Sequence, residues 1–441
     1  MNRRILGLAL PNIITNITVP LLGMVDMAIV GHLSGAHIGA ITIGTSIFNL
    51  IYWNFGFLRM GTSGFTAQAY GAGRWDEALA TLVRACTIAL AIALTLILLQ
   101  WPISLLVPVI FEGSDEVMRM AVTYFFIRIW AAPATLGMYA IKGWFIGMQD
   151  SKTPMWIAIA LNIVNILFSL LFVIVLRWDI AGVAWGTVVA QYSGLAMGIF
   201  FLRRKLPQIQ ASVSIRGSLR WADMRRFFKV NGDIFLRTVC LSTVFTFITA
   251  ASGRIGDQVL AVDALLLQFF TLFSYIMDGF AYAGESLVGR YIGARDSKSL
   301  RLAVRLLLLW GFALTCLFSL LYALGGEWFL RLFTSDAALI SAAGQYLFWV
   351  LAIPVCGFAA FLFDGIFIGA TASRTMRNAM FAATAVFFAL YFGLKALASS
   401  HGTLTTMHWN NILWTAFMAY LLLRGVLQGI RVKKDIYRQA I

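Results

Sequence analysis

Two stretches of this 441-residue sequence nearly repeat each other: KGWFIGMQDSKT at residues 142–153 and DGIFIGATASRT at residues 364–375. Gly143 corresponds to Gly365 and Gly147 to Gly369, each 222 positions apart, which is about half the length of the chain. The same offset relates GAGR at 71–74 to GARD at 293–296. The sequence therefore predicts an internal duplication, in which two halves share one arrangement of elements.

The composition is typical of a membrane protein. Hydrophobic residues make up 60% of the chain and charged residues only 12%, and the mean hydropathy is +0.83. Loop signals divide the chain into twelve apolar segments that can each cross about 30 Å of hydrocarbon. They lie near 5–31, 38–70, 79–109, 117–147, 154–176, 181–202, 227–252, 258–292, 300–324, 338–369, 376–397 and 409–430. We expect an all-α polytopic membrane protein with twelve transmembrane helices.

The basic residues indicate the orientation and the division into domains. The longest polar loop, at 203–229, carries eight Lys or Arg residues, and the last eleven residues carry four more. By the positive-inside rule, this loop and both termini are expected in the cytoplasm. We therefore expect an N-lobe at 1–202 (helices 1–6), a cytoplasmic linker at 203–226 and a C-lobe at 227–441 (helices 7–12). With six helices each, the lobes are expected to be related by a pseudo-twofold axis along the membrane normal.

Asp26 is the first candidate for chemistry, because an ionisable side chain inside a membrane is costly and is by default a functional candidate. Asn12, Asn16, Gly23 and Asp26 follow one another at helical spacing and share one helix face. Pro20 removes the backbone hydrogen bond to the carbonyl of Asn16, so the helix can bend before Asp26. The functional interpretation is a proton or sodium site. The alternative is a carboxylate capped by local hydroxyls or placed at the outer water interface.

The fifth predicted helix carries a second polar face. Asn162, Asn165 and Ser169 are spaced by three and four residues, which places them on one side of the helix. Together with Asn12 and Asn16, these residues are candidates for the lining of a substrate cavity near Asp26. Structural hydrogen bonds between helices are the alternative interpretation.

A third set of charged residues is predicted toward the cytoplasmic ends of the helices. Its members are Arg59, Lys142, Arg237, Asp278, Glu285, Arg290 and Asp364. Both signs occur at similar depth, so ion pairs are expected. They could form a cytoplasmic latch between the lobes or static pairs inside each lobe. Asp364 occupies the repeat position of Lys142, so we expect the two lobes to differ in function.

Several function classes find no support in the sequence. There is no nucleotide-binding motif, Gly-rich phosphate loop, catalytic triad or metal-ligand spacing. We therefore expect no enzymatic activity, no use of ATP, no bound metal and no cofactor other than a coupling ion. The net charge of +15 is assigned to the membrane surface rather than to nucleic acid.

Several strings together resemble the multidrug and toxic compound extrusion (MATE) family, and in particular its DinF-like branch. They are MVDMAIVGHLSGAHIGA (24–40), FLRMGTSGFTAQAYGAG (57–73), NGDIFLRT (231–238), DGFAYAGE (278–285) and DGIFIGAT (364–371). The resemblance covers essentially the whole chain. It implies two six-helix bundles in a V shape that export substrates by ion-coupled antiport.

The resemblance also implies roles for individual residues. Asp26 stands where the family has a coupling aspartate on helix 1, and Asn162 and Asn165 match its asparagine-bearing helix 5. Relatives often have an aspartate four residues after the second asparagine, where this chain has Ser169. That departure disfavours a relay between two carboxylates and a sodium site in the N-lobe, and it favours a single proton-binding carboxylate.

The expected function is a proton-coupled antiporter that exports organic, cationic amphipathic compounds by alternating access, with Asp26 as the coupling carboxylate. It is expected as a monomer in the cytoplasmic (inner) membrane of a bacterium, with small organic substrates and membrane lipids as its partners. A sodium-coupled exporter, a flippase for lipid-linked or phosphate-bearing lipids, and a channel are the alternatives. Arg59 and Arg237 favour the flippase, which needs a basic cavity, whereas the neutral and acidic N-lobe residues oppose it.

Overall fold

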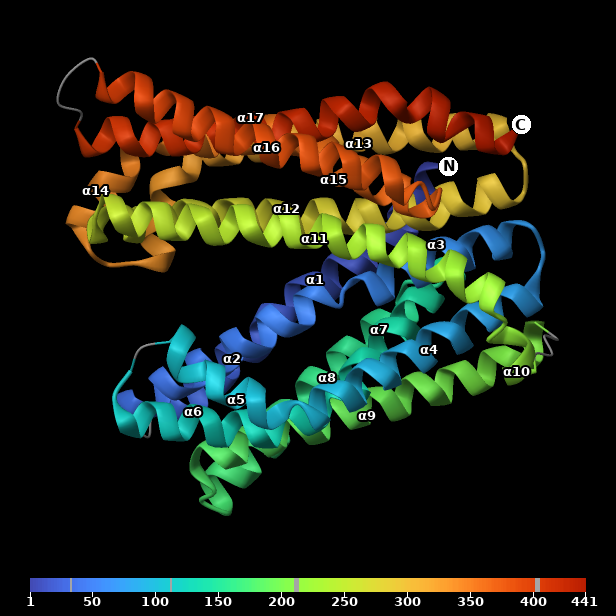
Figure 1. Ribbon diagram of the computed structural model, residues 1–441, viewed down its shortest axis with the longest axis horizontal. Helices are drawn as coiled ribbons and strands as arrows, with labels where there is room; N and C mark the ends of the chain where they lie inside the picture. The colour runs from blue at the N-terminus through green and yellow to red at the C-terminus, as the bar shows by residue number, and fades with distance from the viewer. Residues whose placement is uncertain (32–33, 112, 210–213, 401–404) are drawn as a thin grey trace. The chain divides into compact units, whose positions relative to one another are not determined.

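The computed structural model describes residues 1–31, 34–111, 113–209, 214–400 and 405–441 (Figure 1). Throughout these residues the chain forms helices and no strands. Twelve segments of the described chain are long and apolar enough to cross a membrane. The predicted all-α membrane fold with twelve transmembrane helices is therefore confirmed.

The chain folds as two compact units. One comprises Leu10–Asn231, and the other comprises Gly232–Ile441 together with Met1–Ala9. Both boundaries fall inside helices, in α1 (Asn2–Gly31) and α11 (Trp221–Ile255), rather than in loops. Each of these two helices therefore contributes residues to both units.

The unit Leu10–Asn231 contains most of α1 and the start of α11, and the helices between them. These are α2 (Gly35–Asn54), α3 (Phe57–Gly71), α4 (Trp75–Leu98), α5 (Gln100–Ile110), α6 (Asp115–Arg128), η1 (Ile129–Ala131), α7 (Ala132–Gly147), α8 (Lys152–Leu170), the π-helical turn η2 (Leu171–Val175), α9 (Asp179–Ile209) and the short α10 (Ile215–Ser218). The closest packing is between α8 and α9 and between α3 and α7.

The unit containing Gly232–Ile441 is built from the rest of α11 and five long helices. These are α12 (Asp257–Gly293), α13 (Ser297–Phe333), α15 (Leu347–Gly369), α16 (Ser373–Ser399) and α17 (Thr406–Asp435). The short α14 (Ala337–Gly344) precedes α15, and η3 (Tyr437–Ala440) ends the chain. Figure 1 shows α15 among its neighbours, and it packs against α12, α13 and α17.

Some predicted segments are divided in the structure. The segment predicted at 79–109 forms α4 and α5, which meet at Leu99. Pro102 lies in the first turn of α5 and lacks the N–H that would continue the α4 hydrogen-bond ladder. The chain therefore restarts its helix at the position where a proline is tolerated.

The internal duplication is visible in the turns that end the helices. Gly73 and Arg295 have φ values of 67° and 54°, and Gln149 and Thr371 have φ values of 64° and 51°. Each pair is 222 positions apart. After each of the four residues, a backbone N–H returns to a carbonyl five positions earlier, as in Arg74 to Ala69 and Asp296 to Tyr291. This is the left-handed C-terminal cap of a helix, used twice in each half.

The glycines of the repeated stretch explain why its sequence is retained in both halves. A Cβ at Gly143 would lie 2.3 Å from the carbonyl oxygen of Arg59, and one at Gly365 would lie 2.1 Å from that of Ala281. Arg59 and Ala281 are themselves 222 positions apart. Gly147 and Gly369 approach the carbonyl oxygens of Ser63 and Glu285 in the same way. Only glycine permits this close crossing, so α3 packs on α7 as α12 packs on α15.

Candidate functional site

Asp26 lies in a buried polar site of the unit Leu10–Asn231. Its side chain belongs to α1 and is 2% exposed. The Ser169 Oγ of α8 lies 3.5 Å from Asp26 Oδ1, and the Thr187 Oγ1 of α9 lies 3.4 Å from Asp26 Oδ2. The hydroxyls of Ser169 and Thr187, which approach this carboxylate from α8 and α9, are both neutral.

Two hydrogen-bond acceptors lie within reach of the Thr187 hydroxyl. Its hydroxyl lies 3.4 Å from Asp26 Oδ2 and 3.1 Å from the carbonyl oxygen of Val183, while it accepts from Asn165 Nδ2 at 3.2 Å. A hydroxyl carries one hydrogen and can also accept. It can therefore donate to a charged Asp26, or accept from a protonated Asp26 and donate to Val183. The Thr187 hydroxyl can therefore serve both protonation states of Asp26.

Gly186 makes room for this site. A Cβ at Gly186 would lie 2.4 Å from Ser169 Oγ and 2.8 Å from the Ser169 backbone nitrogen. Because α9 approaches α8 so closely here, Ser169 and Thr187 can both reach the same carboxylate on α1. Asn165 and Ser169 are each 0% exposed, so the site is closed toward α8 and α9.

The remaining predicted residues of the polar stripe also lie between α1 and α8. Asn12 is buried and donates to Ser151 Oγ at 3.0 Å, and the half-buried Asn162 donates to the carbonyl oxygen of Thr18 at 3.2 Å. The predicted faces of the two helices therefore meet along their length. Asn16 is half-buried on α1, and Pro20 lies inside that helix. A role of these residues in a substrate cavity stays a prediction.

Sequence reasoning missed two members of the site, Thr187 and Arg128. The Arg128 guanidinium interacts electrostatically with Asp26 and donates to the Tyr124 hydroxyl at 2.5 Å. It also lies 5.0 Å from the centroid of the Phe48 ring. An arginine inside the apolar segment predicted at 117–147 was the available signal for this residue. A threonine in an apolar helix gives no comparable signal.

Of the predicted charged set, Arg237 and Asp364 come together. Asp364 is buried, and its carboxylate pairs with Arg237 of α11 and with Arg424 of α17, the latter at 2.7 Å. Gln428 also donates to it, at 2.9 Å. All four residues belong to one unit, so this network is internal to that unit. Arg424 and Gln428 were missed, although Arg424 stands inside the predicted segment 409–430.

The other charged residues of that set are placed as follows. Lys142 is half-buried and interacts electrostatically with Arg59, a like charge in the same unit. Asp278 of α12 interacts electrostatically with Arg424. Glu285 is 1% exposed, and the Arg290 guanidinium lies 5.9 Å from the Tyr291 ring. Their participation in a latch stays a prediction.

Another buried carboxylate, that of Asp263, was also missed. Asp263 of α12 is 1% exposed and accepts hydrogen bonds from Ser252 Oγ at 2.5 Å, Asn410 Nδ2 at 2.9 Å and Trp414 Nε1 at 2.8 Å. It belongs to the unit Gly232–Ile441, whereas Asp26 belongs to the other. Among the described residues, no three His, Cys, Asp or Glu side chains gather into a possible metal site.

A duplicated bundle of membrane-spanning helices with a buried polar site in each half is the architecture of a secondary transporter. Comparison with known proteins gives the family. The MatE family model matches residues 11–171 and 234–397, one stretch in each half. The chain therefore belongs to the MATE family of multidrug and toxic compound extrusion transporters, and the predicted resemblance is confirmed.

Individual relatives agree with this assignment. The chain is 37% identical to the DNA damage-inducible protein F of Escherichia coli, over 95% of this chain and 89% of that protein. It is 27% identical to the chloroplastic protein DETOXIFICATION 44 of Arabidopsis thaliana, over 83% of this chain and 71% of that protein. The DinF-like branch predicted from the sequence is therefore confirmed.

Solved structures show the same fold. A MATE crystal structure in the bent conformation has a TM-score of 0.87 at 18% identity and covers 100% of this chain and 97% of its own. The Vibrio cholerae MATE transporter in the bent form has a TM-score of 0.84 at 16% identity, with coverage of 99% and 97%. The prediction of two six-helix lobes is confirmed. The chain is a multi-pass membrane transporter of the multidrug efflux class that works by alternating access, and not an enzyme.

Proposed function

We propose that this protein is a proton-coupled antiporter that exports organic, cationic amphipathic compounds, with Asp26 as the coupling carboxylate. The observation that carries the proposal is the burial of Asp26 between two neutral hydroxyls, those of Ser169 and Thr187. Such partners accept or donate as required, so the carboxyl group can gain and lose a proton in place. A carboxylate fixed by a bound cation or a bidentate arginine lacks this freedom.

Exchange of ligands follows from the charge of the site. A deprotonated Asp26 attracts an organic cation, and a protonated Asp26 does not. The proton and the cationic compound therefore compete for one carboxylate, which is the minimum requirement of an antiporter. The polar side chains of Asn16 and Asn162 lie on the adjoining faces of α1 and α8, and we assign them to the lining of the substrate cavity.

The conformational response is assigned to α1. The attraction between Asp26 and Arg128 exists only while Asp26 is charged, so proton uptake removes one interaction between α1 and α6. Proton uptake also allows the Thr187 hydroxyl to donate to Val183 instead. Pro20 leaves the hydrogen-bond ladder of α1 one bond short just before Asp26. Protonation therefore favours a bend in α1 that reduces the space for substrate.

The first experiment is dye efflux from proteoliposomes under an imposed pH gradient or an imposed sodium gradient. We expect efflux to follow the pH gradient, and Asp26→Asn to lower it at least tenfold while the protein stays folded. Efflux driven by the sodium gradient alone would instead support the sodium-coupled exporter. Movement of fluorescent phospholipid without dye efflux would support the flippase.

Asp263→Asn is the matched control, because it neutralises an equally buried aspartate in the other unit. An amide at 263 can still accept from Asn410 and Trp414 through its oxygen and donate to Ser252 through its nitrogen. Coupled efflux should therefore persist in this variant. Loss of coupling in Asp263→Asn together with full activity of Asp26→Asn would contradict the proposal, because the proton site would then lie in the unit that contains Asp263.

We also propose that the protein works as a monomer in the bacterial inner membrane, with both termini in the cytoplasm. The basic loop at 203–229 and the basic C-terminal tail support this orientation. Arg438→Cys in a variant without the four native cysteines should react with a membrane-impermeant thiol reagent only after the cells are opened. Labelling of intact cells would contradict the orientation.

A further inference from the structure

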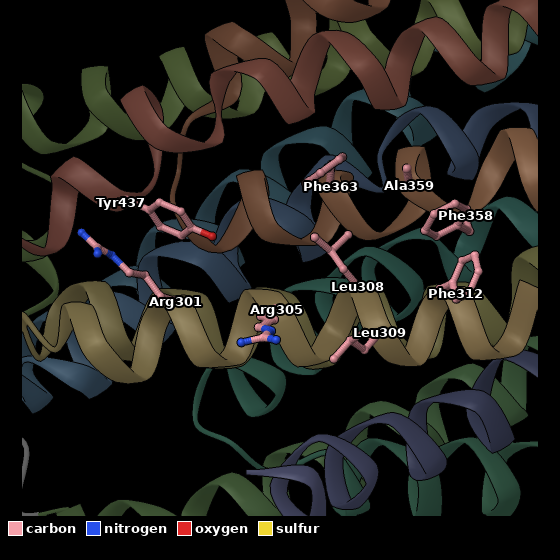
Figure 2. Close-up of a pocket in the computed structure, with 9 residues that line it drawn as sticks. All are labelled: Arg301, Arg305, Leu308, Leu309, Phe312, Phe358, Ala359, Phe363 and Tyr437. Carbon is pink, nitrogen blue, oxygen red and sulfur yellow. The ribbon is translucent and has the colours of Figure 1, made fainter.

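A groove of about 750 Å³ opens on the unit Gly232–Ile441, between α13, α15 and η3. Figure 2 shows Arg301, Arg305, Leu308, Leu309 and Phe312 along α13, with Tyr437, Phe363, Ala359 and Phe358 across from them. The volume is that of a small-molecule site. None of the residues of the Asp26 site or of the Asp364 network lines it, so the transport mechanism leaves this groove unexplained.

One end of the groove is cationic. Arg301 and Arg305 are one helical turn apart on α13 and are both exposed. The Arg301 guanidinium lies 5.7 Å from the centroid of the Tyr437 ring, which holds it at the rim of the groove. Within the described part of the chain, neither guanidinium pairs with a carboxylate. Two arginines and a phenol therefore face one small region without an anion from the protein.

The rest of the groove is apolar. Phe312 lies seven residues beyond Arg305, which is about 10 Å farther along the helix axis. It is 58% exposed, and its ring centroid lies 6.4 Å from that of Phe358 on α15. Leu309 is 53% exposed beside it. These residues belong to the membrane-spanning segments Ser297–Phe333 and Leu347–Gly369, so exposed apolar surface here meets hydrocarbon rather than water.

We propose that this groove binds an anionic diacyl phospholipid. The phosphate contacts Arg301 and Arg305 and accepts from the Tyr437 hydroxyl, and an acyl chain lies along Phe312 and Phe358. Arginine donates two parallel hydrogen bonds to a phosphate, and basic pockets beside membrane helices are suited to anionic headgroups. A free phosphate matches the cationic end alone, whereas a phospholipid matches the cationic end and the hydrocarbon-facing end together.

The bound lipid would join three parts of one lobe. Arg301 and Arg305 belong to α13, Phe358 to α15 and Tyr437 to the last residues of the chain. A phosphate shared between α13 and η3 would fix the C-terminal segment against the lobe. Lipid composition would thereby influence the stability of this lobe independently of the proton site.

The test measures lipid binding to the purified full-length protein by native mass spectrometry, with phosphatidylglycerol and phosphatidylcholine of identical acyl chains. We expect the native protein to bind phosphatidylglycerol at least tenfold more tightly. Arg301→Gln with Arg305→Gln should reduce that preference to about twofold or less. Soluble glycerol phosphate at the same concentration should not displace the lipid, since it lacks the acyl chains.

The matched control is Lys433→Gln with Lys434→Gln, which removes two exposed positive charges from the end of α17 but leaves the groove lining unchanged. This variant should keep the preference. Tyr437→Phe removes a single hydroxyl and should weaken phosphatidylglycerol binding about threefold even if the double arginine variant fails to fold. An unchanged preference in the arginine variant, equal loss in the lysine control, or displacement by glycerol phosphate would each overturn the proposal.

Discussion

The Asp364 network makes a quantitative prediction for stability. Its carboxylate compensates two buried guanidinium ions, because it accepts from both Arg237 and Arg424 and from the Gln428 amide. The Nε atoms of the two arginines make no hydrogen bond to any described residue. Asp364→Asn keeps the shape of the side chain but removes the charge that pairs with both arginines. Breaking a buried pair in this way costs about 3–5 kcal/mol.

The expected change in melting temperature follows from the size of the unit. A unit of this length loses about 2–4 °C per kcal/mol, so Asp364→Asn should lower the melting temperature by roughly 6–20 °C. Intrinsic tryptophan fluorescence of the detergent-solubilised protein during a slow temperature ramp measures this change. Elution of the solubilised variant as a single species from a size-exclusion column checks that it is not aggregated.

An exposed ion pair supplies the control. Arg331 and Glu327 are also 2.7 Å apart, but their side chains are 66% and 64% exposed, whereas those of Arg424 and Asp364 are 2% and 9% exposed. Glu327→Gln should therefore cost no more than about 0.5 kcal/mol. If Asp364→Asn lowers the melting temperature no more than Glu327→Gln does, the burial of the Asp364 network does not increase its contribution to folding stability.

Three further predictions test the packing and the proton site. Gly143→Ala should lower the folding stability by about 1–3 kcal/mol, because its Cβ would lie 2.3 Å from a backbone oxygen of α3. The control, Gly393→Ala, places its Cβ where no atom lies within 4 Å and should be neutral or slightly stabilising. Melting curves compare the two variants. Ser169→Asp should introduce sodium dependence into efflux, because its carboxylate would stand beside Asp26, and unchanged ion dependence would argue against that proximity. Pro20→Ala should slow efflux but preserve substrate binding at high pH, and an identical path of α1 in spin-label distances above and below the Asp26 titration would exclude the bending step.

The internal duplication could be predicted because it rests on residues with few substitutes. Gly143 and Gly365 face backbone oxygens, and any side chain there would force two helices apart. This steric requirement keeps glycine at equivalent positions of the two halves, so the repeat can be recognised in the sequence. The faces that carry Asp26 and Ser169 were also predictable, since helical periodicity determines which residues of one helix lie together.

The partners across helices could not be predicted in the same way. Thr187 reaches Asp26 from α9, and Arg424 reaches Asp364 from α17. Which helices are neighbours, and in which register, depends on the packing of the whole lobe rather than on the pattern within one segment. Hydroxyl side chains are common in membrane helices, so the sequence alone does not indicate which threonine contacts a carboxylate on another helix.

The two halves share their backbone plan but differ in their buried charges, and this difference bears on the proposed mechanism. The close glycine crossings and the left-handed helix ends occur in both halves, whereas Lys142 in one half stands where Asp364 stands in the other. Adding a proton to Asp364 would break its direct pairing with two guanidinium ions, whereas adding one to Asp26 reverses the direction of hydrogen bonds to hydroxyls and removes the attraction to Arg128. A duplicated scaffold can therefore support an exchangeable proton in one lobe and a static ion network in the other, because the glycines fix the packing and leave the polar positions free to diverge.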